Sequence, residues 1–475
     1  MTHGMVSAPQ PEAVEAGLDI LKGGGNVVDA AIGAALVQTV VDPMMCGVAG
    51  FGSMHLYLAD RDVHTCIDFH GRAPLATTPD MWEQLIIREC DDGFGFVLKG
   101  EVNEIGYQSM TTPLTIKAFD EALNRFGTRS LADMLAPAIQ YCEDGFAVRP
   151  SVHGFWTRGA ESGRIARIRG LTDDPATAKI YTKADGSIRG IGEILRNPDM
   201  ARTYRRIAEA GVDDFYTGEI ARQIDADMRA NGGLITLEDL ATCETEEVAP
   251  LWTDYRGHRV ATNQPPGGGL MIVVMLNILE NFDLAAMGHN SADYIATVSE
   301  AMKIATVDKD TRMGDPRFFD IPFDELMSKD YSKAMADRIK RGEKTTVPRM
   351  NPGGSDSKET THINVADPAG NCVSMTHSLG SSSGTVTDGL GFMYNNCMMV
   401  FDPRPGHAGS LAPGKARFSA LSPPIVFKDG KPFFLVGSPG GTPITMGNLQ
   451  ATLNAVAFAL TAQEVLLSLR FTSPS

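Results

Sequence analysis

Apolar residues near the start of the chain recur with the period of a helix. Val14, Leu18 and Leu21 are spaced i, i+4 and i+7, which predicts an amphipathic helix ending at the glycines 23–25. The next segment, NVVDAAIGAALVQTVVD, begins at a candidate N-cap, Asn26, and is apolar on nearly every side. It predicts a helix buried on all faces.

The pattern then changes between helical and alternating. Residues 51–59 and 64–69 alternate and predict a hairpin, whereas residues 110–345 are dominated by helical patterns that end at glycine. After a connector rich in Gly, Ser and Pro at 349–358, strands dominate. The predicted C-terminal elements are a hairpin of 361–365 and 372–379 across DPAGN, a hairpin in PPIVFKDGKPFFLVGSPGG, and a helix from Pro443 to about Leu460.

Helices in the first three quarters and hairpins in the last predict an α+β protein. We expect antiparallel sheet to be covered by helices. The 475 residues are enough for two or three domains, or for one large layered domain.

Composition excludes several kinds of partner. The net charge of −16 argues against nucleic acid and anionic membrane, and no apolar run is long enough to span a bilayer. No signal peptide is evident, so we expect a cytoplasmic protein, or a periplasmic or secreted one if a segment precedes this chain. The seven scattered cysteines and ten histidines form no zinc or disulfide pattern, so we expect no metal and no cofactor.

The stretch SKETTHINVADPAG carries the candidate chemistry. A Thr hydroxyl can attack the peptide bond before it, and hydrolysis of the resulting ester leaves a free N-terminal Thr. At Glu359-Thr360 this would give a nucleophile with its own base, because an α-amino group has a pKa near about 8. The alternative is that the Thr pair simply begins a strand, and that His362 is a strand-face histidine.

A glycine pair near the C-terminus is a candidate oxyanion hole. Gly440 and Gly441 precede a predicted helix start, where backbone N–H groups point outward. A tight turn or a phosphate cradle would explain the same residues, although the Lys-Ser/Thr of a Walker motif is missing. The glycines of GVAGFG at 47–52 precede a strand, which argues against a dinucleotide site.

These motifs occur, in order, within a longer series of specific stretches. The series includes GMVSAPQPEAVEAGLDILKGGGNVVDAAIGAAL, ATNQPPGGGLMIVVMLNILENF, DKDTRMGDPRFFDIPF, TTHINVADPAGNCVS and LSPPIVFKDGKPFFLVGSPGG. Over nearly its whole length the chain resembles the γ-glutamyltransferase (γ-glutamyltranspeptidase) family of N-terminal-nucleophile hydrolases.

The resemblance implies a fold and a maturation step. The fold would be a four-layer αββα sandwich, made as a precursor that cuts itself before Thr360. Residues 1–359 and 360–475 would then be a large and a small subunit that stay associated, and further assembly into a homo-oligomer is left open. By the same resemblance, Thr360 is the nucleophile, Ser378 supports it, and Gly440 and Gly441 form the oxyanion hole.

The substrate pocket departs from the family pattern. Where typical members hold the substrate α-amino group with Asn, Gln and Asp, this chain has Gly380, Cys397 and Val400, although the preceding pair Asn395-Asn396 is kept. Each hydrogen bond lost from a charged group costs roughly 1.5–3 kcal/mol, so recognition of free γ-glutamyl compounds should suffer.

The carboxylate side of the pocket is also altered. The family's arginine aligns with His70, with Arg72 two residues later and able to take over the anion, and a serine pair becomes Ser419-Ala420. We therefore expect a small amide substrate with a carboxylate, as in the acylase and amidohydrolase branches that include cephalosporin acylases and oxamate amidohydrolase.

Two segments bear on the outcome of the reaction. The short segment between Phe401 and Ser419 predicts an open site, so water should be the main acceptor. The chain stops at Ser475, where members usually continue with more strands, which predicts an uncovered sheet edge and a shortened small subunit. The alternatives are a true γ-glutamyl transferase or glutathione hydrolase, and an unprocessed, inactive homologue; a nucleotide-binding oxidoreductase is a distant third.

Overall fold

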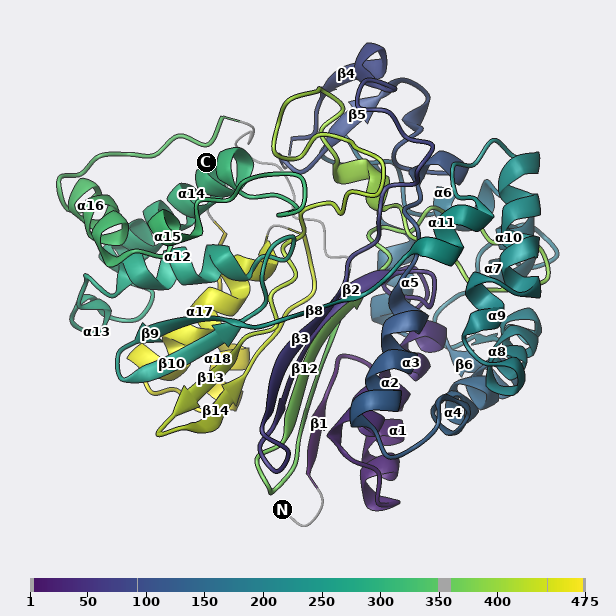
Figure 1. The fold of residues 1–475 in the computed structure, drawn as a ribbon, viewed down its shortest axis with the longest axis horizontal. Coiled ribbons are helices and arrows are strands. Elements are labelled where there is room, and N and C mark those ends of the chain that lie inside the picture. Colours follow the sequence, from purple (N-terminus) through teal and green to yellow (C-terminus); the bar gives the residue numbers. More distant parts are fainter. Residues whose placement is uncertain (1–3, 92, 349–359, 442, 473–475) are drawn as a thin grey trace.

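The computed structural model describes residues 4–91, 93–348, 360–441 and 443–472. Two antiparallel sheets lie face to face between two groups of helices (Figure 1). This confirms the predicted four-layer αββα arrangement. The large sheet has the order β1 (Met5–Ser7), β11 (Thr361–Ala366), β12 (Cys372–Ser378), β2 (Phe51–Leu58), β3 (Val63–Phe69) and β8 (Glu246–Val248). The small sheet has the order β14 (Lys431–Leu435), β13 (Ile425–Lys428), β10 (His258–Thr262) and β9 (Leu251–Tyr255).

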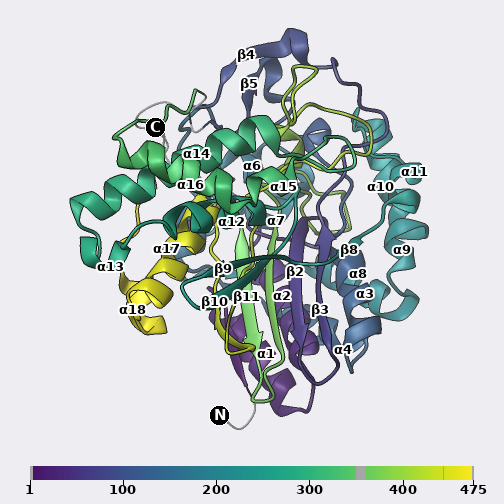
Figure 2. The same cartoon turned by 60° about the vertical axis from the view of Figure 1, so that its left-hand side comes forward.

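The helices before β8 cover the outer face of the large sheet (Figures 1 and 2). The second helix, α2, is buried along its full length and packs on β11 and β12, as its apolar sequence predicts. Asn26 caps it, because its side-chain oxygen accepts the N–H groups of Val28 and Asp29. The helices are α1 (Pro11–Lys22), α2 (Val27–Val41), α3 (Thr115–Phe126), α4 (Leu131–Asp144), α5 (Pro150–Trp156), α6 (Arg169–Thr172), α7 (Pro175–Tyr181), α8 (Pro198–Ala210), α9 (Asp213–Tyr216), α10 (Glu219–Ala230) and α11 (Leu237–Thr242).

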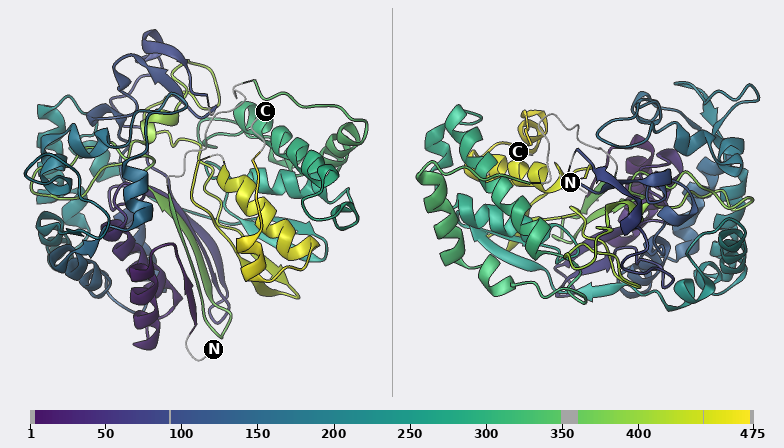
Figure 3. Two further views of the ribbon diagram at one scale, coloured as in Figure 1. Left: turned by 180° about the vertical axis from the view of Figure 1, so that it is seen from behind. Right: turned by 90° about the horizontal axis from the view of Figure 1, so that it is seen from above.

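The remaining helices cover the small sheet (Figure 3). The apolar helix α12 packs against β9, α14, α16 and α17 and is buried along its whole length. The segment HRVATNQPPGGGLM thus forms strand, turn and helix, as predicted. The helices of this layer are α12 (Gly269–Leu279), α13 (Leu284–Met287), α14 (Ala292–Arg312), α15 (Phe323–Leu326), α16 (Lys329–Lys340), α17 (Pro443–Ala457) and α18 (Ala462–Leu467).

The inner faces of the two sheets meet through aromatic and imidazole side chains. His55 on β2 stacks on His64 of β3, and their Nε2 atoms are 2.9 Å apart. Trp252 and Phe427 of the small sheet pack around His64. The sheets are therefore joined by a layer of packed aromatic and imidazole rings.

Each sheet ends in a strand with one neighbour among the described strands. The edge strands are β1 and β8 in the large sheet and β14 and β9 in the small sheet, and between β1 and β14 lies a groove of about 600 Å³ lined mainly by apolar residues such as Met5, Phe434 and Val465. The uncovered sheet edge expected from the sequence stays a prediction. Two further hairpins lie outside the sandwich: β4 (Ile86–Glu89) with β5 (Phe96–Leu98), and β6 (Phe146–Ala147) with β7 (Ile194–Leu195).

Among the described residues, no helix combines the length and apolar character that crossing a bilayer requires.

Candidate active site

Thr360 lies at the start of β11, beside the last residue of β12. The strand register pairs Thr361 with His377, so position 360 faces position 378. The Thr360 hydroxyl donates to Ser378 Oγ at 3.0 Å, and the Gly380 N–H donates to the same oxygen at 2.9 Å. Ser378 is thus fixed by the chain that follows it and directed at the Thr360 hydroxyl.

The backbone at Thr360 has an unusual conformation. Its φ is +135°, a value that β-branched residues rarely adopt, and only 6% of the residue is exposed. Conformations of this kind cost on the order of 1–3 kcal/mol and persist where the surroundings enforce them. Glu359, the other half of the predicted cleavage site, lies outside the described residues.

The residue after Thr360 anchors the strand to helix α2. The Thr361 hydroxyl oxygen accepts from Gln38 Nε2 at 2.8 Å, and His377 Nε2 donates to Gln38 Oε1 at 2.9 Å. Gln10 joins the same buried group, 3.2 Å from Thr361 Oγ1. Because β11 is anchored on this side, Thr360 is placed at a defined position beside Ser378.

His362 is a buried strand-face residue. Its Nδ1 lies 2.8 Å from Thr376 Oγ1 and its Nε2 lies 3.0 Å from Asn364 Oδ1. Because the amide oxygen of Asn364 only accepts, Nε2 carries the proton and Nδ1 accepts from Thr376. Burial lowers the pKa of His362 to about 4, so the ring is neutral at pH 7. Both ring nitrogens are used within the sheet.

The glycine loop runs along the same strand. Gly437 packs so closely on the His362 ring that a Cβ there would lie about 2.1 Å from it. Three residues later Gly440 is buried with φ of +126°, and the Gly441 carbonyl accepts the N–H of Ile444 in the first turn of α17. The predicted oxyanion glycines therefore follow a loop that packs beside β11. Thr442, the residue before the predicted helix start at Pro443, lies outside the described residues.

The predicted carboxylate-binding residues make contacts within the protein. His70 is enclosed, with Nδ1 donating to Asp68 Oδ2 and Nε2 contacting Ser419 Oγ, each at 2.5 Å. The order of groups matches a Ser–His–Asp triad, but Ser419 is only 1% exposed and its oxygen also accepts the Leu421 N–H. We interpret the three side chains as a fixed, buried hydrogen-bonded group.

Arg72 is held by two carboxylates. Its guanidinium lies 2.8 Å from Glu246 and 3.5 Å from Asp315, and the residue is buried. Moving it toward a substrate anion would leave these carboxylates without that partner. The structure therefore places Arg72 in an ion-pair cluster that joins β8 to the segment after α14.

Gly380 and the Asn pair form the scaffold behind Ser378. A Cβ on Gly380 would lie 2.5 Å from Asn396 Oδ1, and that oxygen accepts the Ser381 N–H at 2.8 Å. Asn395 is bound on both sides, through Oδ1 to Thr111 and through Nδ2 to two backbone carbonyls. Both amides therefore hold the chain in place.

Cys397 is buried in a small apolar cluster close to Gly380 and the Asn pair in the sequence. It begins the short 3₁₀-helix η4 (Cys397–Val400) and packs with Phe51, Ala420 and Ile444. Burial raises the pKa of Cys397 to about 11, so the thiol is uncharged at pH 7. The positions 380, 397 and 400 thus offer a glycine, a thiol and a half-buried Val400, with no carboxylate among them.

One charged residue beside this cluster, Arg417, was not among the residues that the sequence singled out. The Arg417 guanidinium lies over the Phe51 ring, 4.5 Å from its centroid, and 5.8 Å from the centroid of Phe94. Its position two residues before Ser419 was the available signal. That position alone does not indicate a role for Arg417, because its contact with Phe51 forms only in the folded chain.

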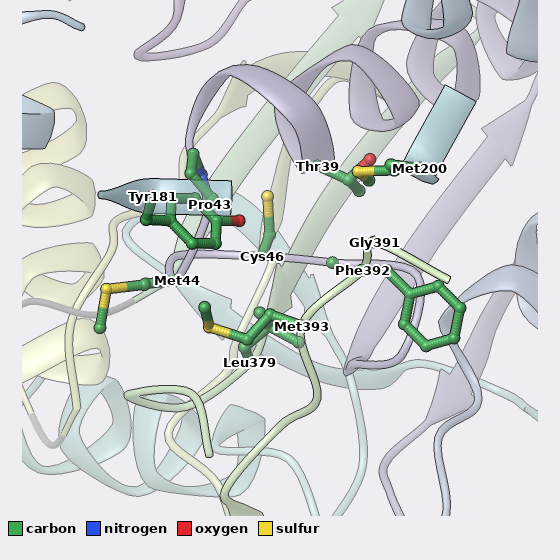
Figure 4. A pocket seen from close by; sticks show the side chains of 11 residues that line it. Thr39, Pro43, Met44, Cys46, Tyr181, Met200, Leu379, Gly391, Phe392 and Met393 are labelled. Atoms are coloured by element: carbon green, nitrogen blue, oxygen red, sulfur yellow. The ribbon is translucent and has the colours of Figure 1, made fainter. Parts of the chain in front are cut away.

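A second cavity lies on the helical side of the sheet. Figure 4 shows it among Thr39, Cys46, Leu379 and Met393, with a volume of about 10 Å³. That is the space of about one water molecule, so it is a packing void that cannot hold an amide substrate.

Comparisons with known proteins agree with this geometry. The sequence profile described as gamma-glutamyltranspeptidase matches residues 13–474. The glutathione hydrolase proenzyme of Escherichia coli (strain K12) is 35% identical over 99% of this chain and 80% of its own length. The acylase ACY 1 proenzyme of Pseudomonas sp. (strain SE83) is 36% identical over 98% of this chain and 81% of its own.

A solved structure supports the same assignment. Cephalosporin acylase from Bacillus halodurans superposes with a TM-score of 0.82 at 29% identity, covering 98% of this chain and 83% of that one. Fold and sequence agree, and the predicted enzyme class is confirmed. The chain belongs to the gamma-glutamyltranspeptidase family of N-terminal-nucleophile hydrolases.

Proposed function

We propose that this protein cuts itself before Thr360 and then hydrolyses amides whose acyl group ends in a carboxylate. The observation that carries the proposal is the hydrogen bond from the Thr360 hydroxyl to Ser378, at a backbone held with φ of +135°. A hydroxyl fixed on a strained backbone, next in the chain to the peptide bond that it would attack, has the position that self-cleavage needs.

The cut needs no residue outside this site. Thr360 Oγ1 attacks the carbonyl carbon of Glu359, the C–N bond breaks, and its nitrogen takes the hydroxyl proton. Water then opens the ester between Glu359 and Thr360, which gives a carboxyl group on residue 359 and a free α-amino group on Thr360. The mature nucleophile thus gains its own base.

Residues 1–359 and 360–475 would stay together after the cut. The large sheet combines β1, β2, β3 and β8 from the first part with β11 and β12 from the second. The small sheet likewise joins β9 and β10 to β13 and β14. Separation would break both sheets and expose their cores.

In the mature enzyme the α-amino group of Thr360 takes the hydroxyl proton as Oγ1 attacks the substrate amide. The N–H groups of Gly440 and Gly441 stabilise the oxyanion, while Ser378 keeps the hydroxyl aligned. The amine leaves with the proton, and an acyl ester remains on Thr360. Water, deprotonated by the same α-amino group, then releases the acid.

Water is the acceptor we expect. The segment between Phe401 and Ser419 is held to itself: the Asp402 N–H donates to the Gly409 carbonyl, and Lys415 Nζ donates to the carbonyls of Ala408 and Ser410, all at 2.8 Å. Because these bonds hold the segment against itself, we expect that it does not cover the active site and that water reaches the acyl-enzyme.

The pocket wall favours a simple dicarboxylic acyl group over γ-glutamyl. An α-ammonium group would meet the Cys397 thiol and Val400, which provide no anionic partner. Both an acylase and glutathione hydrolases are among the relatives, so glutathione hydrolysis is the second candidate.

Glutaryl and γ-glutamyl p-nitroanilides test the choice, because they differ only in the α-amino group. We expect kcat/KM for the glutaryl compound to be at least about tenfold higher. The charged α-amino group of the γ-glutamyl compound would lack hydrogen-bond acceptors in the pocket. A preference for γ-glutamyl, with transfer to glycylglycine faster than hydrolysis, would favour the second candidate. Thr360→Ala is the inactive control for both.

A further inference from the structure

The residues predicted to bind the substrate carboxylate are engaged elsewhere. His70 contacts Asp68 and Ser419, and Arg72 lies between Glu246 and Asp315. A carboxylate buried in this pocket needs a cationic partner, because an isolated charge is costly to transfer from water. The contacts of these residues with a substrate stay a prediction, and Arg417 is a further buried cation, two residues before Ser419.

Arg417 is connected to the nucleophile through Phe51. Phe51 begins β2, where the register pairs it with Ser378, the residue that accepts from the Thr360 hydroxyl. The Arg417 guanidinium lies 4.5 Å from the centroid of the Phe51 ring. Phe51 therefore contacts this cation through its ring and pairs with Ser378 through its backbone.

Arg417 is also connected to the oxyanion glycines. The Phe94 ring is 5.8 Å from the Arg417 guanidinium, and a Cβ on Gly441 would contact that ring at 3.8 Å. Phe94 is therefore close to both the guanidinium and the second glycine. The cation is near both parts of the proposed acyl-transfer machinery.

The remaining surroundings fit the end of an acyl chain. Arg417 is only 6% exposed and acts on Cys397 at close range, lowering the thiol pKa against the larger effect of burial. Cys397, Phe51 and Ala420 form one apolar cluster. Methylene groups would pack on this cluster, with an anion at the guanidinium end.

We propose that Arg417 binds the terminal carboxylate of the substrate acyl group and so determines specificity for dicarboxylic monoamides. A planar guanidinium suits this role, because it can donate two parallel N–H bonds to a carboxylate. The inference rests on the proposed function for its substrate, but the binding of a free dicarboxylate can be measured without turnover.

The kinetic test compares two amides of equal size. One is glutaryl p-nitroanilide, and the other carries a neutral primary amide in place of the terminal carboxylate. We expect Arg417→Met to lower kcat/KM for the charged substrate roughly 10- to 100-fold, mainly through KM, and to change the neutral one less than about threefold. Arg417→Lys should recover part of the loss.

Arg259→Met is the matched control, because Arg259 also lies over an aromatic ring, 4.2 Å from the centroid of Trp252, but in β10 and largely exposed. It should leave both substrates unchanged. Equal losses on the charged and the neutral substrate in Arg417→Met would overturn the role in specificity.

Calorimetric titration with glutarate separates this inference from the proposed function. Glutarate should bind the wild-type protein and the Arg259→Met variant, but at least about tenfold more weakly to Arg417→Met. If glutarate binds in this way and neither amide is hydrolysed, the proposed function fails and the assignment of Arg417 stands. If glutarate binds the wild type and Arg417→Met equally, or binds neither, the assignment is wrong.

Discussion

In the proposed mechanism, Ser378 supports the nucleophile Thr360 without help from a histidine. Its oxygen accepts from Thr360 at 3.0 Å and from the Gly380 N–H at 2.9 Å, so its own proton is directed away from both and can reach an oxyanion only if the contacts rearrange. His362, two residues from Thr360, is neutral and uses both nitrogens within the sheet. Alignment of Thr360 therefore depends on Ser378.

At this scale we predict that Ser378→Ala slows both self-cleavage and turnover, the latter about 10- to 100-fold, because a hydrogen bond to a reacting group is lost. Ser378→Thr keeps the hydroxyl and should retain most activity. Rates measured with the glutaryl substrate, beside gels of the freshly purified protein, check both. Equal activity of Ser378→Ala and wild type would contradict the assigned role.

Among the elements, helix α2 depends most clearly on its cap. Asn26 accepts two N–H groups and its Nδ2 donates to the Phe126 carbonyl at 2.7 Å, so it also ties α2 to the end of α3. Asn26→Ala should lower the free energy of unfolding by about 1–3 kcal/mol. Thr461→Ala, at an exposed capping box on α18, should cost less. Thermal midpoints of the two variants test this, and equal shifts would contradict it.

The histidines of the strands make stability depend on pH. Burial lowers the pKa of His55 and His377 to about 3 and that of His64 and His362 to about 4, whereas unfolded histidine titrates near about 6.5. The unfolded chain thus binds more protons below pH 6.5, so stability is lost as the pH falls from about 6.5 toward 4, by up to about 1.4 kcal/mol per pH unit for each histidine.

Asp42 opposes this trend, because burial raises its pKa to about 6 and the folded state then holds an extra proton between about pH 4 and 6. Burial also raises the pKa of Asp120 and Asp308, so three carboxyl groups oppose the four histidines. Urea unfolding at pH 7 and pH 5 should therefore show a lower midpoint at pH 5. A midpoint that stays constant or rises would show that the buried histidines do not control acid stability.

At the scale of the whole molecule, both sheets combine strands from either side of residue 360. We predict that the two fragments elute together in size exclusion under native conditions and separate only in denaturant. Independent elution of the fragments in native buffer would contradict the observed strand order.

Much of the fold could be predicted from the sequence. The helices, the hairpins and the αββα class were confirmed, because periodicity and turn residues are local and the motifs of the family are specific. The pairing of Val6 with Val365 and the contact of Arg417 with Phe51 join distant parts of the chain, so no local pattern announces them. For the same reason, the ion pairs of Arg72 appear only in the structure.

The most direct test of the central claim is the intact mass of the purified protein beside a Thr360→Ala variant. We predict two wild-type fragments, residues 1–359 and 360–475, with Thr360 as the new N-terminus, and a single variant chain of 51.0 kDa. An uncut wild-type chain, or a cut that persists in Thr360→Ala, would contradict the account.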